Sequence, residues 1–139
     1  MAHLLADAPI WSQGWTHIVP VPLHPRRMLR RGYNQADLLA RWTARILHKR
    51  GVRVNLSPQL LARHRATKPQ TELAAGDRFA NVEAAFLVPR KRRAQVRQSR
   101  IVVIDDVTTT GATLTACRRA LESAGAAQTC GLALLRALP

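Results

Sequence analysis

Two adjacent carboxylates, Asp105 and Asp106, stand directly after the apolar run of residues 101–104 and directly before a turn rich in hydroxyl groups. Residues 108–113 read Thr-Thr-Thr-Gly-Ala-Thr and lead into a predicted helix. Unpaired N–H groups at a helix N-terminus bind phosphate, and Gly111 lets the backbone approach closely. The carboxylates repel that phosphate but accept hydrogen bonds from the hydroxyls of an attached sugar. A ribose 5-phosphate satisfies both halves of this segment.

Helix capping is a simpler use of the same residues, in which Asp106 or a threonine accepts a hydrogen bond from the first helical turn. Capping accounts for one residue and leaves the second acid and the other hydroxyls unexplained. The segment has neither the Gly-Lys-Ser/Thr of a Walker loop nor the GxGxxG of a dinucleotide-binding fold. The sugar phosphate is therefore the favoured interpretation.

The elements that must position this turn alternate between strand and helix. Strands are predicted at residues 17–23, 60–63, 84–88, 101–104 and 127–135, and helices at residues 34–50, 71–82 and 113–124. The continuous β-branched run at 101–104 is typical of a strand buried on both faces of a parallel sheet. This order predicts an α/β fold, with a parallel sheet flanked by helices and joined by right-handed crossovers.

The helix at residues 34–50 carries its apolar residues at helical spacing, and these predict the face that enters the core. The residues of that face are Leu38, Leu39, Trp42, Ile46 and Leu47. We expect Trp42 to pack in the core and not to form a ligand platform. The length of 139 residues fits one domain over residues 1–139, and its first 16 residues are expected to be irregular.

The chain is strongly basic, with 22 Lys and Arg against 8 Asp and Glu, a formal charge of +14. The densest basic run lies at residues 89–100, and residues 24–35 form the second. Two interpretations of the first run remain open, a contact surface for a polyanion and a solvated basic loop. The candidate polyanion contacts are Arg90, Lys91, Arg92 and Arg93.

The two cysteines, Cys117 and Cys130, have neither metal-ligand spacing nor the density of a disulfide scaffold. They are expected to be reduced, packed thiols. No apolar run approaches the roughly 18 to 20 residues of a membrane helix, and the first residues do not read as a signal peptide. We therefore expect a cytoplasmic protein without membrane insertion.

Residues 101–113, IVVIDDVTTTGAT, resemble the phosphoribosyl-pyrophosphate signature of type I phosphoribosyltransferases at all thirteen positions. Three further stretches are similar to the ComF/GntX branch of that family. These are IVPVPLHPRRMLRRGYNQADLLA from residue 18, RHRATKPQTEL from residue 63 and RFANVEAAF from residue 78. The resemblance covers most of the chain from residue 18 onward and implies the Rossmann-like fold of type I phosphoribosyltransferases.

The resemblance also implies roles for individual residues. Asp105 and Asp106 correspond to the catalytic pair that holds the ribose hydroxyls. The residues that would wrap the 5-phosphate are Val107, Thr108, Thr109, Thr110, Gly111, Ala112 and Thr113. The residues of the family's pyrophosphate loop would be Pro22, Leu23, His24, Pro25 and Arg26.

Residues 63–72 correspond to the family's flexible loop, in which Arg63 and Lys68 are candidates to neutralise the leaving pyrophosphate. Two alternatives stay open, because Lys68 also reads as a solvent lysine and His24 as a residue that hydrogen-bonds within its loop. Mg²⁺ is the implied cofactor, held mainly by phosphoribosyl pyrophosphate and not by protein ligands.

The chain departs from the branch in two respects. It contains no paired cysteines of the N-terminal zinc-binding module, which is either lost or lies outside this chain, and no segment resembles a purine- or pyrimidine-specific hood. Two functions are compatible with the sequence. In the first, the protein binds phosphoribosyl pyrophosphate with Mg²⁺ and transfers the ribosyl phosphate to an acceptor that the sequence does not define. In the second, it is a non-catalytic adaptor in DNA uptake that binds single-stranded DNA or competence proteins through its basic surface. An oligomer is compatible with both.

Overall fold

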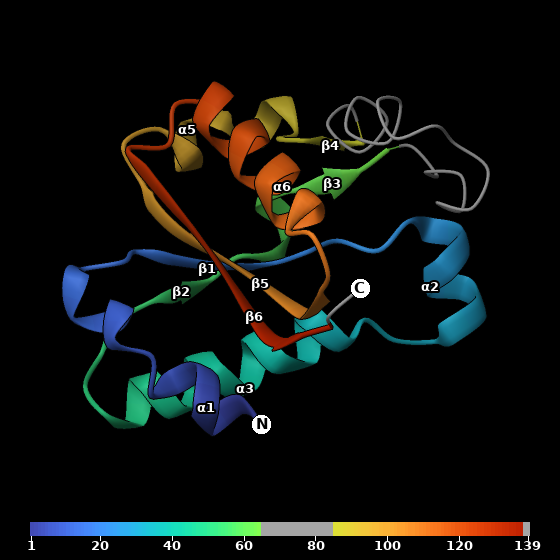
Figure 1. The fold of residues 1–139 in the computed structure, drawn as a ribbon. Helices are drawn as coiled ribbons and strands as arrows, with labels where there is room; N and C mark the ends of the chain where they lie inside the picture. Colours follow the sequence, from blue (N-terminus) through green and yellow to red (C-terminus); the bar gives the residue numbers. More distant parts are fainter. Residues whose placement is uncertain (65–84, 138–139) are drawn as a thin grey trace.

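The computed structural model describes residues 1–64 and 85–137, and its centre is a four-stranded parallel sheet in the order β2-β1-β5-β6 (Figure 1). The two inner strands are β1 (His17–Pro20) and β5 (Arg100–Thr108), and the outer strands are β2 (Asn55–Leu56) and β6 (Gln128–Arg136). Four consecutive residues of β1 pair with residues 101–104 of β5. The expected parallel α/β sheet is confirmed.

Helices cover both faces of this sheet (Figure 1). On one face α6 (Ala112–Ser123) packs Leu114, Cys117 and Leu121 against alternate residues of β1 and β5. On the other face α3 (Gln35–Lys49) packs with Leu47 and Ala40, joined by α1 (Ala2–Ala6). Because neighbouring side chains of a strand point to opposite faces, β5 contributes to both cores. We call these the α6 face and the α3 face.

The expectation that the first 16 residues are irregular is wrong. They form α1 and a 3-10 helix, η1 (Pro9–Gln13), and place Leu5, Trp11 and Trp15 in the core of the α3 face. Each indole N–H donates to a backbone oxygen, Trp11 to Leu5 at 2.8 Å and Trp15 to Ile10 at 2.8 Å. A segment too short to show a periodic pattern is thus ordered by its two tryptophans.

The helix predicted at residues 34–50 is confirmed as α3, and its predicted face is confirmed at Leu47 and in part at Leu39 and Ile46, but wrong at Leu38 and at Trp42, which was expected in the core. The buried residues are Ala36, Ala40, Thr43 and Leu47, whereas Leu38 is 45% and Trp42 56% exposed. Small side chains at the first three of these positions let the helix axis come close to the sheet, and Leu47 fills the remaining space. Leu38 and Trp42 therefore lie on an exposed stripe beside the buried one.

Several shorter elements differ from the sequence-based expectations. The loop expected after β1 contains α2 (Pro25–Arg31), and residues 60–63 divide between the 3-10 helix η2 (Pro58–Leu60) and β3 (Ala62–Arg63). Strand β3 pairs antiparallel with β4 (Phe86–Leu87) outside the main sheet. The expected loop at residues 65–70 and the helix at residues 71–82 lie outside the described residues.

The basic run at residues 89–100 is not an extended loop. It forms a 3-10 turn, η4 (Arg90–Arg92), and one helical turn, α5 (Arg93–Val96), before β5 begins. Val88 and Val96 are buried in the core of the α6 face and hold this turn in place. Both cysteines are free thiols as expected, Cys117 buried and Cys130 partly buried.

Candidate functional site

The candidate site begins where β5 continues past the end of β1. Pro20, the last residue of β1, pairs with Ile104, and beyond it β5 pairs only with β6 as far as Thr108 and Arg136. The side of Asp105 and Asp106 that faces away from β6 is therefore not covered by a neighbouring strand. In parallel sheets, ligands bind beyond such carboxyl ends.

Asp105 and Asp106 are both half-buried and adjoin each other. The Asp106 N–H donates to Asp105 Oδ1 at 2.9 Å. Burial, together with a side-chain hydrogen bond to Asp106, raises the pKa of Asp105 from 3.8 to about 7. The pair thus holds a proton near neutral pH and can both donate to and accept from a diol or share a cation.

The two aspartates face different surroundings. Asp105 lies near Cys117 of α6, where its charge adds to the effect of burial in raising the pKa of the thiol. Asp106, with its neighbour Val107, borders a hollow along α3 on the opposite face of the sheet. The pair therefore stands where the α6 face and the α3 face meet at the end of β5.

The turn after β5 leads directly into α6. Gly111 precedes the helix with a φ of 78°, a left-handed conformation that glycine adopts readily and threonine does not. The Thr110 hydroxyl accepts a hydrogen bond from the Ala112 N–H at 3.4 Å, and Thr109 and Thr110 are exposed. The predicted phosphate-binding residues, 107–113, run from the last two residues of β5 through the turn to the first two residues of the 12-residue helix α6.

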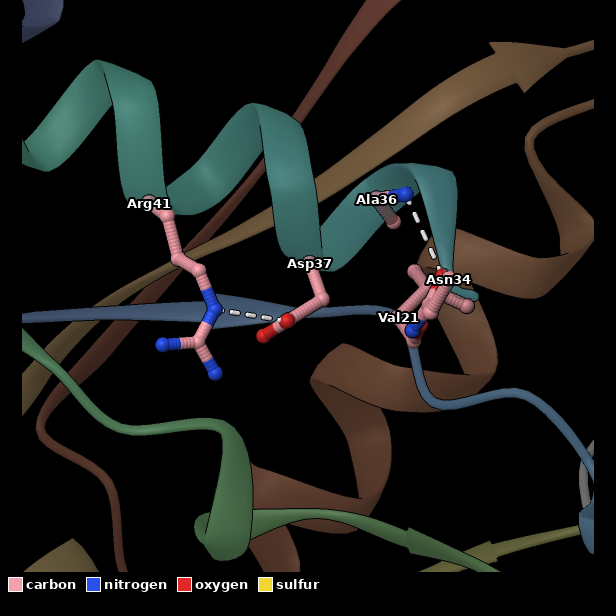
Figure 2. Close-up of polar contacts among 5 residues, drawn as sticks. All are labelled: Val21, Asn34, Ala36, Asp37 and Arg41. Carbon is pink, nitrogen blue, oxygen red and sulfur yellow. Dashed lines mark hydrogen bonds and ion pairs between the residues drawn. The ribbon is translucent and has the colours of Figure 1, made fainter. Parts of the chain in front are cut away.

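The loop after β1 starts beside this turn, because the Val21 N–H donates to the Ile104 carbonyl at 2.8 Å. Asn34 holds the loop from the other side (Figure 2). Its side-chain N–H donates to the Val21 carbonyl at 3.0 Å, and its Oδ1 accepts from the Ala36 N–H at 3.1 Å. One amide therefore caps α3 and fixes the start of the predicted pyrophosphate loop.

The predicted pyrophosphate loop is only partly a loop. Pro22, Leu23 and His24 connect β1 to α2, whereas Pro25 and Arg26 form its first turn. The His24 Nδ1 accepts from the Arg26 N–H at 3.3 Å, so this histidine caps a helix. The Arg26 N–H is occupied by this bond, and its exposed guanidinium remains available for an anion.

Of the two residues assigned to the flexible loop, Arg63 lies near Asp105. It belongs to β3, its guanidinium lies over the Phe86 ring at 5.3 Å, and its positive charge lowers the pKa of Asp105, against the larger effect of burial. The structure thus brings Arg63 to the candidate site on a strand and not on a loop. Lys68 lies outside the described residues.

The basic turn lies apart from this site. The residues Arg90, Lys91, Arg92 and Arg93 precede the amino end of β5, whereas the aspartates lie in its carboxyl half (Figure 1). Arg90, Lys91 and Arg93 are exposed, and Arg92 is half-buried with its Nη1 donating to Gln95 Oε1 at 3.4 Å. A ligand on this turn is therefore separate from one at the aspartates.

The hollow along α3 has a volume of about 1530 Å³ and runs along both flanks of the helix. Leu134 and Leu135 of β6 line it together with Leu38, Leu39 and Trp42. Within residues 1–64 and 85–137 no group of three or more His, Cys, Asp or Glu is placed to hold a metal ion. At the candidate site the protein offers two carboxylates, which fits an ion such as Mg²⁺ that keeps most of its ligands from water and phosphate.

Asn34 is the site residue that the sequence did not single out. The sequence does indicate its capping role, because an asparagine directly before a periodic apolar run is a typical helix N-cap. The bond to the Val21 carbonyl has no such signal, since it joins residues that are 13 positions apart. Among the described residues no helix has the length and apolar character needed to cross a membrane.

Known proteins are similar in sequence to most of this chain. It is 40% identical over 109 residues to competence protein F of Haemophilus influenzae, and 38% identical over 110 residues to the DNA utilization protein YhgH of Escherichia coli K12. It is 32% identical over 120 residues to the competence protein ComFC of Bacillus subtilis. These matches cover 78%, 79% and 86% of this chain.

Each match covers 44% of the relative, so the chain spans less than half the length of the curated relatives it matches. No family model matches the chain.

Proposed function

From this ComF-like chain we infer a role in DNA uptake or DNA utilisation, in which the basic turn of η4 and α5 contacts single-stranded DNA. The printed names of the relatives support the process. The charge of +14 supports single-stranded DNA as the ligand, because the phosphates of its backbone attract an excess of Arg and Lys. The activity of the longer relatives as whole proteins is also part of this proposal, since the chain matches less than half of each.

The observation that carries the DNA contact is the arrangement of the basic turn. Arg90, Lys91 and Arg93 are exposed on two short helical turns, and Val88 and Val96 bury the same segment against the core. A fixed cluster of three cations loses less side-chain and backbone entropy on binding than a disordered basic tail does. The turn therefore suits a phosphate backbone.

The test is the binding of a fluorescent single-stranded oligonucleotide at several salt concentrations. We expect affinity to fall steeply as salt rises. Replacing Arg90, Lys91 and Arg93 together by glutamine should weaken binding. It should also reduce the slope of log affinity against log salt concentration by the equivalent of about three phosphate contacts. Arg92 is left in place because it packs against the turn.

The matched control removes the same charge from α2, with Arg26, Arg30 and Arg31 replaced by glutamine. This variant should keep most of the affinity and salt dependence. An equal loss in the two triple variants would show that net charge alone drives binding, and unchanged binding by the η4 and α5 variant would exclude this turn as the contact.

The carboxyl end of β5 favours a second candidate function, the binding of phosphoribosyl pyrophosphate with Mg²⁺. The supporting observation is that a carboxylate pair with a raised Asp105 pKa adjoins a threonine-rich turn at the start of α6. Asp105 and Asp106 would hold the ribose diol, the turn would hold the 5-phosphate, and Arg63 would lie near the diphosphate. Transfer of the ribosyl phosphate to an acceptor is the reaction that this complex would support.

Calorimetry with phosphoribosyl pyrophosphate and Mg²⁺ tests this candidate. Binding is expected in the wild type and should be lost when Asp105 and Asp106 are both replaced by asparagine. The far-ultraviolet circular dichroism of the double variant should stay unchanged, because asparagine keeps the shape of each side chain. A folded wild type that binds no ligand, or a double variant with full affinity, would remove this function.

A further inference from the structure

The flank of α3 that faces β6 is an apolar groove without a partner in the described structure. Its floor, which we call the α3–β6 groove, consists of Leu38, Leu39, Trp42, Ile46 and Leu134. Two of these residues are large and exposed, Leu38 at 45% and Trp42 at 56%, and Leu39, Ile46 and Leu134 are half-buried. An apolar surface gathered from one helix and one strand end marks an interaction site more than scattered exposed residues do.

The groove borders the flank of α3 that packs on the sheet, and Leu39 and Ile46 pack partly against that core. Residues 38, 42 and 46 recur every four positions along α3, so they form a ridge that follows the helix. The buried residues, Ala36, Ala40 and Leu47 among them, form a different stripe. Ala44 and His48 also border the hollow, but helical spacing puts them on its other flank, and we leave that flank out of the groove.

The edges of the groove are basic. Arg45 and Lys49 extend from α3 beside Trp42, and His3 borders the hollow from α1. The Arg45 guanidinium lies over the Trp42 ring at 5.2 Å, which holds its charge at the edge of the apolar floor. Asp106 is the one acid among the residues that line the hollow, and it stands at the end where β5 stops.

We propose that the α3–β6 groove binds an amphipathic helix of a partner protein, with leucine-like residues on the floor and glutamate or aspartate against Arg45 and Lys49. The ridge of residues 38, 42 and 46 fits this occupant, because the side chains of a second helix interdigitate with such a ridge at intervals of three and four residues. Acidic flanks complement the cations at the edge and set the orientation of the helix.

Charge and composition disfavour two other occupants. A second copy of this chain would bring another +14 to the interface. Single-stranded nucleic acid stacks its bases on aromatic rings, and Trp42 is the one aromatic residue among those lining the hollow. This inference stands apart from the DNA contact on η4 and α5 and from the sugar-phosphate site, since neither uses the floor of the groove.

The probe is a pair of synthetic amphipathic helices with the same leucine stripe, one flanked by glutamate and the other by lysine. Trp42 reports binding, because Trp11 and Trp15 are buried in the core. The glutamate peptide should shift the emission of Trp42 to shorter wavelength and protect it from acrylamide quenching. The lysine peptide should bind at least about tenfold more weakly.

Two variants with the same change of charge locate the contact. Leu38→Glu places a carboxylate on the floor of the groove and should weaken binding of the glutamate peptide at least about tenfold. Leu29→Glu places it on α2, where Leu29 is 87% exposed and outside the groove, and should leave the affinity within about twofold of wild type. Both positions are exposed, so thermal melts should show both variants folded.

A charge swap then tests the edge of the groove. Replacing Arg45 and Lys49 together by glutamate should reverse the preference, so that the lysine peptide binds more tightly than the glutamate peptide. The proposal is overturned if neither peptide binds, if both bind equally, or if Leu38→Glu and Leu29→Glu have the same effect.

Two further results would assign the groove to another occupant and also overturn the proposal. The first is sedimentation showing a wild-type dimer that Leu38→Glu dissociates. The second is displacement of the glutamate peptide by a single-stranded oligonucleotide from the wild type and from the variant lacking the charges of Arg90, Lys91 and Arg93.

Discussion

The α6 face and the α3 face of the same sheet differ in how much of the apolar surface of each helix is buried against the sheet. On the α6 face the large apolar residues of the helix, Leu114 and Leu121, are buried, and α6 has no large apolar residue among the exposed ones. On the α3 face the helix buries mainly small residues and leaves Leu38 and Trp42 exposed. One helix thus packs on its own sheet and still leaves part of its apolar surface exposed.

The two faces also treat the paired aspartates differently. Asp105 lies toward the α6 face, near Cys117 and Arg63, where burial raises its pKa. Asp106 borders the hollow of the α3 face. A ligand held by both carboxylates would therefore contact a closed core on one side and an open groove on the other.

The largest expected effect comes from matched leucine substitutions that compare the two stripes of α3. Leu47→Ala, on the buried stripe, should lower the free energy of unfolding by about 2 to 5 kcal/mol, as should Leu121→Ala on α6. Leu38→Ala removes the same atoms from the same helix but should cost less than about 1 kcal/mol, because the side chain is already exposed to water.

Urea denaturation monitored by circular dichroism measures all three variants. Equal destabilisation by Leu38→Ala and Leu47→Ala would show that the exposed stripe is part of the core, and the contrast between the two faces would disappear.

The next effect concerns the proton on Asp105. Its pKa is about 7 in the folded protein and about 3.9 in an unfolded chain, so between these values the folded state binds more protons. Stability contributed by this group therefore falls as pH rises from about 4 to about 7 and stays low above that range. Asp105→Asn removes this cost and should stabilise the protein at pH 8 by about 2 kcal/mol, after allowance for solvent screening.

The gain from Asp105→Asn should be clearly smaller at pH 5 than at pH 8, because the wild-type carboxyl is mostly protonated in the folded state at pH 5. Thermal melts at the two pH values check this. An equal gain in stability at pH 5 and pH 8, or a loss of stability at pH 8, would contradict the raised pKa of Asp105. It would also contradict the conclusion that burying this carboxyl on the α6 face lowers the stability of the protein.

The smallest effect separates the two hydrogen bonds of Asn34, which anchors the start of α3 (Figure 2). Asn34→Ala removes both and should destabilise the protein by about 1 to 2 kcal/mol. Asn34→Asp keeps an acceptor for the Ala36 N–H and loses the donor to the Val21 carbonyl, so the helix stays capped while the loop after β1 is released.

Hydrogen exchange at residues 21–24 and 36–38 distinguishes the two roles of Asn34. The aspartate variant should exchange faster in the loop and at the wild-type rate in the first turn of α3, whereas the alanine variant should exchange faster in both. Faster exchange in α3 alone would show that Asn34 caps the helix without positioning the loop.

Much of the fold was predictable because it depends on local pattern and chain order. The β-branched run of residues 101–104 predicted a strand buried on both faces, and Ile101, Val102, Val103 and Ile104 are all fully buried. The acids and the threonine-rich turn follow that strand directly, so their place at its carboxyl end was predictable too. The segment of residues 1–16 was not, because Trp11 and Trp15 order it through contacts with distant residues.

The sequence by itself determined that two carboxylates and a threonine-rich turn come together near the carboxyl end of β5, because consecutive residues of a strand and its following helix must lie together. Only the tertiary structure decided which stripe of α3 is buried and which is left open. Helical spacing permits both, and the choice depends on the contacts that Ala36, Ala40 and Leu47 make with strands from distant parts of the chain.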